Sequence, residues 1–232
     1  MSRLFALADL HLSLIGDKPM DVFGEAWVDH ADRMAGSWDE RVAASDTVLL
    51  PGDLSWARSL EAAAPDLAWI GARPGRKILL RGNHDSWWSG VAKVRAALPA
   101  SCDLLQNDAH EVDDWVIVGS RGWTAPDDPT AVPVDVKTYH RELERLRMSI
   151  RDADRRFDDD RPRLAMLHFP PWIRDRKPGA VVEILESARV RVCVYGHLHG
   201  ADHSLAVTGN HRGIDYRLVA SDAVDFGPVE IV

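Results

Sequence analysis

Five short stretches of the 232-residue sequence place carboxylate, amide and imidazole groups at spacings that suit metal binding. They are Asp9-x-His11, Gly52-Asp53, Gly82-Asn83-His84-Asp85, the lone His168, and Gly196-His197-x-His199. In an extended segment, residues two apart point to the same side, so each x-separated pair can supply two ligands. Oxygen and imidazole donors without thiolate suit Mn, Fe, Zn, Ni or Mg better than a structural zinc site. The sequence therefore predicts a metal centre.

The chemistry of such a centre depends on whether the stretches act together. A lone Asp at a strand end usually caps a turn, and a lone His such as His168 is usually a hydrogen-bonded structural residue. Taken as an ordered set, the five stretches are poorly explained as structural residues. A carboxylate such as Asp53 can bridge two cations, and two cations about 3.5–4 Å apart clamp both oxygens of an in-line phosphoryl transfer. The set favours that chemistry.

The elements that must position these residues are strands, because each stretch follows a short apolar run. The expected strands cover residues 3–8, 47–50, 77–80, 164–167 and 190–195. Ligands and catalysts gather at the carboxyl ends of strands in α/β sheets, which predicts that the stretches converge. Apolar periodicity predicts helices over 25–44, 60–70, 87–98, 139–157 and 180–188, and strands near 104–105 and 115–119. The last thirty residues, with turns at Gly209-Asn210 and Gly213, suggest antiparallel strands. We read residues 1–232 as one α/β domain.

Composition narrows the class of partner. The formal net charge is −8, which disfavours broad electrostatic binding to nucleic acid or to anionic lipid. No apolar run approaches the ~18 residues of a membrane helix, and the apolar stretch at the N-terminus is too short for a signal peptide. The two cysteines, Cys102 and Cys193, lack metal-binding or redox spacing. These features lead us to expect a cytoplasmic protein without a membrane partner. They do not indicate an oligomeric state.

In sequence order, the five stretches resemble the motifs of the calcineurin-like metallophosphoesterase superfamily: D-x-H, G-D, G-N-H-[DE], a lone His, and G-H-x-H. The resemblance spans residues 9–199. It implies an α/β (α+β) fold, a four-layer α-β-β-α sandwich of two mixed β-sheets flanked by helices. It also implies two divalent metal ions as cofactors, with Mn as the expected metal and Fe, Zn, Ni or Mg as alternatives.

The resemblance also implies roles for single residues. One metal would be held by Asp9, His11, Asp53 and His199, and the other by Asp53, Asn83, His168 and His197. Asp53 would bridge the two. His84 corresponds to the family's catalytic histidine, which binds no metal but contacts the phosphate oxygens and protonates the leaving group. Metal-activated hydroxide would attack a phosphate ester in line.

One departure bears on the substrate. Serine/threonine phosphatases of this superfamily carry G-D-x-x-D-R-G, whereas here Trp56 and Ala57 occupy the second Asp and the Arg positions, and Arg58 comes one residue late. The sequence is closer to small stand-alone bacterial phosphohydrolases. We expect a small-molecule phosphate mono- or diester, such as a nucleotide. The alternatives are a phosphoprotein phosphatase and a non-catalytic protein-interaction module on the same fold.

Other residues near the motifs have two interpretations. Four tryptophans follow the motifs closely and either stack on a substrate ring, such as a nucleobase, or pack the neighbouring helices: Trp56, Trp87, Trp88 and Trp172. Packing is the stronger expectation for Trp87 and Trp88. Asp85 or Ser86 is expected to cap the helix over 87–98. Arg121 and Trp123 are expected to border the site, and His203 to support it. The remaining histidines have no motif context: His30, His110, His140 and His211.

Overall fold

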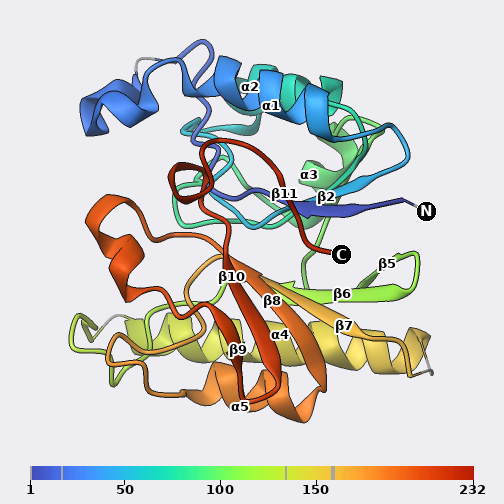
Figure 1. Ribbon diagram of the computed structural model, residues 1–232, viewed down its shortest axis with the longest axis vertical. Helices are drawn as coiled ribbons and strands as arrows, with labels where there is room; N and C mark the ends of the chain where they lie inside the picture. The colour runs from blue at the N-terminus through green and yellow to red at the C-terminus, as the bar shows by residue number, and fades with distance from the viewer. Residues whose placement is uncertain (1, 17, 134, 158–159) are drawn as a thin grey trace. The chain divides into compact units, whose positions relative to one another are not determined.

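The computed structural model describes residues 2–16, 18–133, 135–157 and 160–232. The chain divides into two compact units. Unit 1 comprises Met1–Leu104 and Val219–Val232, and unit 2 comprises Leu105–Leu218. The C-terminal segment therefore returns to the N-terminal unit (Figure 1). The interpretation of residues 1–232 as one domain stays a prediction.

Unit 1 contains a mixed five-stranded sheet in the order β11-β1-β2-β3-β4. The strands are β1 (Leu4–Ala6), β2 (Thr47–Leu50), β3 (Arg76–Leu79), β4 (Cys102–Leu104) and β11 (Val229–Glu230). The four strands β1 to β4 pair in parallel, and β11 pairs antiparallel to β1. Every residue of β2 is buried, as expected for a parallel strand covered on both faces.

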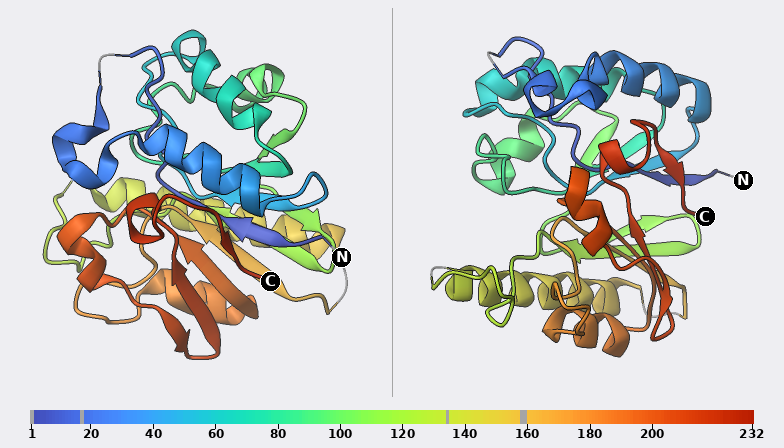
Figure 2. Two further views of the ribbon diagram at one scale, coloured as in Figure 1. Left: turned by 45° about the horizontal axis from the view of Figure 1, so that its top comes forward. Right: turned by 60° about the vertical axis from the view of Figure 1, so that its left-hand side comes forward.

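Helices α1 (His30–Arg41) and α2 (Leu60–Ala72) lie on one face of this sheet (Figures 1 and 2). α1 buries Met34 and Trp38, and the hydroxyl of Ser59 caps α2 by accepting from the Ala62 N–H at 3.2 Å. The remaining helices of unit 1 are α3 (Val91–Ala97) and three short 3-10 helices: η1 (Met20–Phe23), η2 (Glu25–Trp27) and η4 (Ser221–Ala223).

Unit 2 contains a mixed six-stranded sheet in the order β5-β6-β7-β8-β10-β9. The strands are β5 (His110–Val112), β6 (Trp115–Ser120), β7 (Arg163–Leu167), β8 (Val190–Tyr195), β9 (Gly209–His211) and β10 (Ile214–Leu218). Helices α4 (Asp135–Arg156) and α5 (Ala180–Ser187) lie on one face of it, and η3 (Gly200–Leu205) follows β8 (Figure 1). α4 turns the predicted apolar face, including Tyr139, Leu143 and Leu146, toward the core.

The predicted fold class is confirmed: there are two mixed sheets, and helices flank them. Two local predictions are wrong. The helix expected over 87–98 begins only at Val91, because Trp87 and Trp88, in the loop before it, pack into the hydrophobic core. Gly209-Asn210 lies inside β9 rather than in a turn. The turn expected at Gly213 is present, and β9 and β10 pair antiparallel as expected, while β10 also pairs in parallel with β8.

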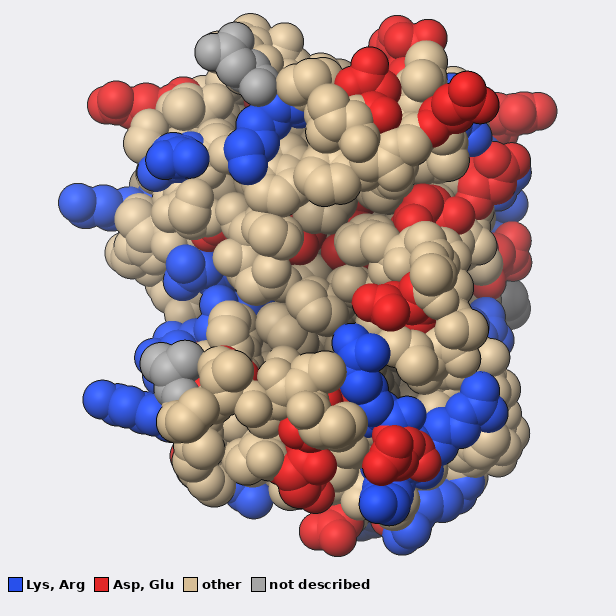
Figure 3. Space-filling model, turned by 90° about the vertical axis from the view of Figure 1, so that its left-hand side faces the viewer, with Lys and Arg blue, Asp and Glu red and all other residues tan. Residues whose placement is uncertain are grey.

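On the face drawn in Figure 3, Lys and Arg side chains gather along the left edge, Asp and Glu at the upper right, and both kinds meet at the lower right. Across the described residues, every helix is too short or too polar to cross a bilayer.

Candidate metal centre

In unit 1, the loops that follow β1 and β2 run side by side and carry Asp9, His11 and Asp53. The Asp9 N–H donates to the Gly52 carbonyl at 3.0 Å, and the His11 N–H donates to the Asp53 carbonyl at 2.9 Å. These three residues have positive φ, at 59°, 46° and 52°. Non-glycine residues seldom adopt this region, and such strain concentrates at functional sites. The two loops are thus shaped to present these side chains.

The same side chains are buried together. Asp9, His11 and Asp53 are 0%, 3% and 1% exposed. Ligand atoms of Asp9 lie within 4.8 Å of those of both His11 and Asp53. His11 Nε2 lies 3.8 Å from Asp53 Oδ2. Burying two carboxylates costs several kcal/mol unless a cation or hydrogen bonds compensate, so this donor set fits a divalent cation.

His84 lies beside this cluster but differs from it in exposure. Its N–H donates to Asp53 Oδ1 at 2.8 Å, which fixes the backbone, and its Nε2 lies 4.0 Å from Asp53 Oδ2. The His84 side chain is 44% exposed, against 1% for Asp53. Asn83 precedes it on the same loop, so one loop supplies an amide and an accessible imidazole.

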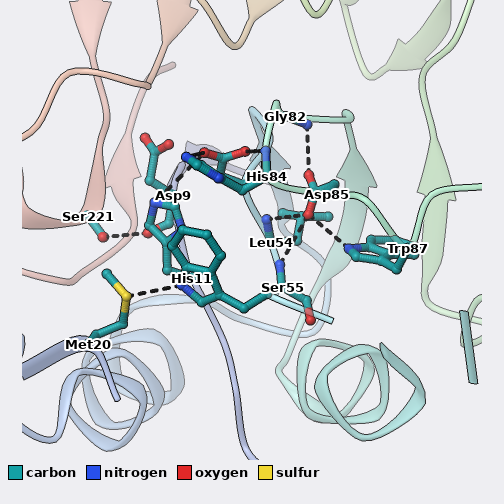
Figure 4. Close-up of polar contacts among 12 residues, drawn as sticks. Asp9, His11, Met20, Leu54, Ser55, Gly82, His84, Asp85, Trp87 and Ser221 are labelled. Carbon is teal, nitrogen blue, oxygen red and sulfur yellow. Dashed lines mark hydrogen bonds and ion pairs between the residues drawn. The ribbon is translucent and has the colours of Figure 1, made fainter. Parts of the chain in front are cut away.

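Asp85, predicted as a helix cap, has a different role. α3 begins six residues later, after Gly90, while the Asp85 carboxylate is fully buried. Its oxygens accept from the backbone N–H groups of Gly82, Leu54 and Ser55 and from Trp87 Nε1 (Figure 4). Burial and the nearby charge of Asp53 raise the pKa of Asp85 to about 6. The cap prediction is wrong for both candidates: Asp85 accepts from backbone donors on another loop, and the Ser86 hydroxyl donates to the Ala57 carbonyl at 3.1 Å.

Two supporting residues carry no motif signal. Asp66, buried on α2, accepts from the Leu14 N–H at 3.0 Å and from the Ser55 hydroxyl. Ser221, near the C-terminus, donates its hydroxyl to the Asp9 carbonyl at 2.7 Å. Asp66 thus holds both loops, and Ser221 holds the loop after β1 from the far end of the sequence. The one sequence signal for such a role is that Asp66 is a charged residue in the middle of a largely apolar helix.

The tryptophans of unit 1 mostly serve packing. Trp87 and Trp88 are 1% and 3% exposed and belong to the core, as expected. Trp56 stacks on His11, with ring centroids 5.0 Å apart and planes at 21°, and lies 4.4 Å from the His84 ring. Its Nε1 points to Met20 Sδ at 3.1 Å. Trp56 thus supports both imidazoles, and the prediction that it stacks on a substrate ring stays untested.

In unit 2, the histidine motifs follow β7 and β8. His168 is fully buried, and its N–H donates to the Arg121 carbonyl at 3.1 Å. Its ring lies 5.1 Å from that of His197, which has a φ of 73°. The Phe169 ring lies 4.0 Å from His197. His199 immediately precedes η3. The neighbouring strand ends therefore bring His168 and His197 together, as predicted.

The structure also places the other residues that the sequence analysis named near the motifs. Arg121 pairs with the buried Glu142 on α4 at 3.2 Å, and its guanidinium lies over the Trp123 ring, 4.4 Å from its centroid. Arg121 therefore positions His168 through its carbonyl rather than presenting a free charge. His203 lies in η3, and Arg58 is exposed at the end of its loop. The predicted ligand sets that combine both units stay predictions.

A family model described as calcineurin-like phosphoesterase matches residues 2–201. The Gene 66 proteins of Mycobacterium phages D29 and L5 are 38% and 35% identical to the chain over 85 residues. That region is 37% of this chain and 41% of each phage protein, so the match spans less than half the length of these curated relatives.

Two solved structures resemble the whole chain. Phosphopantetheinyl hydrolase (PptH) from Mycobacterium tuberculosis has a TM-score of 0.60 at 14% identity, covering 100% of this chain and 96% of that one. A protein of unknown function from Aquifex aeolicus has a TM-score of 0.54 at 17% identity, covering 99% and 96%. At these identities the likeness shows the fold.

Proposed function

Because the chain belongs to the calcineurin-like phosphoesterase family, we propose that it is a metal-dependent phosphohydrolase, a dinuclear enzyme that cleaves a phosphate mono- or diester of a small molecule. The observation that carries the proposal is the environment of Asp53. Its buried carboxylate lies 3.8 Å from His11 Nε2, holds the His84 backbone, and leaves the His84 side chain exposed. The buried Asp53 carboxylate suits a metal ligand, and the accessible His84 imidazole beside it suits a general acid.

The proposed ligands follow the family motifs. One metal ion would be held by Asp9, His11, Asp53 and His199, and the second by Asp53, Asn83, His168 and His197. The burial and grouping of Asp9, His11 and Asp53 within unit 1 support their part of this assignment. When bound, a pair of divalent cations, with Mn as the proposed metal, would supply Lewis acidity and a nucleophilic water at neutral pH.

The protein's own contribution to the reaction centres on His84. Its backbone is fixed on Asp53, so its imidazole is held in place while the ring stays accessible. The proposed role is to donate a hydrogen bond to a phosphate oxygen and a proton to the departing oxygen. A cysteine nucleophile is not needed. Cys102 and Cys193 are buried, and burial raises the pKa of both thiols, which disfavours thiolate.

The alternatives considered above differ in their support. The exposed His84 and the hydrolase family argue against a non-catalytic interaction module. A phosphoprotein phosphatase has less support, because Trp56 packs on His11 where such enzymes carry an orienting Asp. The net charge of −8 favours a small substrate over a polynucleotide. We further propose that the enzyme acts in the cytoplasm.

The test uses Mn-loaded protein with p-nitrophenyl phosphate and its bis-ester. We expect metal-dependent hydrolysis that falls about 10²–10⁴-fold in kcat for His84→Asn. Metal content, measured by plasma mass spectrometry, should not change, because His84 is not a proposed ligand. His140→Asn, on the exposed face of α4, is the matched control. Metal-loaded protein without activity, or a His84→Asn variant as active as the control, would contradict the proposal.

A substrate screen then separates the remaining classes. It compares mononucleotides, cyclic nucleotides, dinucleotides, phosphopeptides and a carrier protein bearing phosphopantetheine, the group named for PptH. Preference for a free nucleotide or another small ester supports the small-molecule assignment. Preference for phosphopeptide or carrier protein overturns it.

A further inference from the structure

A cavity of about 140 Å³ lies within unit 2, against the candidate ligand His197. Besides His197, its walls include four aromatic side chains: Trp123, Tyr139, Phe169 and Trp172. These residues come from the loops after β6 and β7 and from α4. Tyr139 belongs to the hydrophobic core of unit 2, and Trp123 and Trp172 pack against that core, so the cavity presents fixed aromatic surfaces that suit an apolar or planar group.

The aromatic wall is ordered outward from His197. The Phe169 ring lies 4.0 Å from the His197 ring, and the Trp123 ring lies 4.7 Å from Phe169. Trp123 is fixed from behind, since its Nε1 donates to Asp135 Oδ1 at 2.8 Å. A ligand that enters this cavity therefore meets preformed aromatic surfaces that continue to a candidate metal ligand.

Trp172 completes the wall. It follows Pro170 and Pro171, and its ring stands edge-on to Tyr216, with centroids 5.6 Å apart and planes at 76°. The prolines restrict the backbone before it. The ring is thus held by Tyr216 and by His211, whose ring centroid lies 5.8 Å away, and it also lines the cavity.

The cavity also has a polar rim of mixed charge. The Arg174 guanidinium lies 3.9 Å from Asp128 and 3.9 Å from Asp202. Asp128 is anchored by the N–H groups of Arg174 and Thr130, whereas Asp202 is largely exposed. A carboxylate accepts and a guanidinium donates, so this rim can bind a ring edge that carries both N–H groups and lone pairs.

The size limits the occupant to part of a substrate. Pockets that enclose a drug-sized ligand measure about 300–1,000 Å³, whereas an apolar cavity of about 150 Å³ accommodates benzene. The volume of about 140 Å³ therefore suits one ring system and excludes a folded peptide segment.

We propose that this cavity binds the heteroaromatic ring of the leaving group, and that the substrate is a phosphate ester of a nucleoside. The proposal rests on the phosphohydrolase function given above and names its substrate class. The aromatic walls stack on the base, Arg174 and Asp202 contact its edge, and the adjoining His197 places the ester at the metal centre.

The first experiment measures binding without catalysis. Adenosine and ribose are each titrated into ¹⁵N-labelled protein, and the indole N–H signals are followed by NMR, with assignments from single Trp→Leu variants. Adenosine should shift the Trp123 and Trp172 signals, and ribose should not. Trp172→Leu should weaken adenosine binding about tenfold, as expected for the loss of one stacked ring. Trp115→Leu, in β6 and outside the cavity, is the matched control.

The second experiment uses a substrate pair that differs only in the base: AMP and ribose 5-phosphate, or their methyl esters if only diesters are cleaved. The wild-type protein should prefer the nucleotide in kcat/KM, and the preference should fall about tenfold in Trp172→Leu, carried by KM. Arg174→Gln, at the partly exposed rim, should reduce the preference without a risk to folding.

The two proposals fail in different ways. If no phosphate ester is hydrolysed but adenosine shifts the Trp123 and Trp172 signals, the function is wrong and the nucleoside site stands. If esters are hydrolysed but adenosine shifts neither signal, or AMP and ribose 5-phosphate are cleaved equally well, the nucleoside site is wrong and the function stands.

Discussion

The Asp85 carboxylate accepts a hydrogen bond from the Leu54 N–H at 2.9 Å, although the two residues are 31 positions apart. The other oxygen accepts from the Gly82 N–H at 2.7 Å. One carboxylate thereby joins the loop after β2, which carries Asp53, to the loop after β3, which carries His84. Together with the hydrogen bond from the His84 N–H to Asp53 Oδ1, this carboxylate holds the two side chains in their relative position.

Asp85→Asn tests that role. Asparagine replaces one acceptor oxygen with an N–H₂ donor, which must face a backbone N–H in a fully buried site. We expect the free energy of unfolding to fall by about 2–3 kcal/mol, and hydrolysis to fall with it because Asp53 and His84 separate. Urea unfolding and kcat measurements check both effects. Asp103→Asn, which removes an exposed partner of Arg76, should change stability by no more than about 0.5 kcal/mol.

Gly82→Ala tests how closely the same loops approach. A Cβ on Gly82 would lie 2.0 Å from Asp53 Oδ1 and 2.2 Å from the Asp53 nitrogen, so the backbone and the carboxylate must both move. We expect at least a tenfold loss of metal affinity, measured by calorimetric titration with Mn²⁺.

The control for that change is Gly36→Ala, an exposed position inside α1 where a Cβ meets nothing within 4 Å. It should raise stability by about 0.5–1 kcal/mol and leave Mn²⁺ affinity unchanged. Equal Mn²⁺ affinities for the two variants would show that the close approach of Gly82 to Asp53 does not matter.

These loops also show what could be predicted from sequence. Asp9, Asp53 and His84 were identifiable because each follows an apolar run, and the run locates the strand end. The roles of Asp85 and Asp66 were not, because their partners lie on other loops: Asp66 reaches Leu14, 52 positions away. A nearby turn is the default partner for an Asp, and only the tertiary fold reveals a distant backbone donor.

The same limit applies to the tryptophans. Trp56 and Trp172 look alike in sequence, as aromatic residues that closely follow a motif. In the structure Trp56 stacks on His11, whereas Trp172 lines a cavity. The difference depends on which element packs against each ring, and the chain near either residue does not encode it.

Lys77→Met probes a buried cation in β3. The Lys77 ammonium donates to the carbonyls of Gly71, Arg73 and Gly75 at 3.3, 2.6 and 2.9 Å, and its side chain is fully buried. Methionine retains the apolar stem but leaves carbonyls at the end of α2 without this donor. We expect a loss of about 2 kcal/mol in urea unfolding. The exposed Lys93→Met in α3 should be neutral, and equal stabilities of the two variants would contradict this role.

Asp46→Asn tests a pH dependence at the start of β2. Burial by itself would raise the pKa of Asp46, but the N–H groups of Arg3 and Ala43 and the Arg3 guanidinium outweigh burial and hold the pKa below its usual 3.8. A depressed pKa means that the folded state binds the proton less readily than the unfolded chain. The stabilisation is therefore complete above pH 3.8 and is lost as the pH falls below it.

Asparagine at position 46 cannot ionise, so the difference in unfolding free energy between wild type and variant should itself depend on pH. We expect about 1–2 kcal/mol at pH 7, similar at pH 5, and a clear decrease at pH 3, measured from urea midpoints. Asp46 is 2% exposed while the Arg3 side chain is 44% exposed, so the two backbone N–H groups contribute more to the effect than the guanidinium does. A difference that stays constant from pH 7 to pH 3 would show that the Asp46 carboxylate titrates alike in the folded and unfolded chains, and that its hydrogen bonds with Arg3 and Ala43 do not favour the charged form.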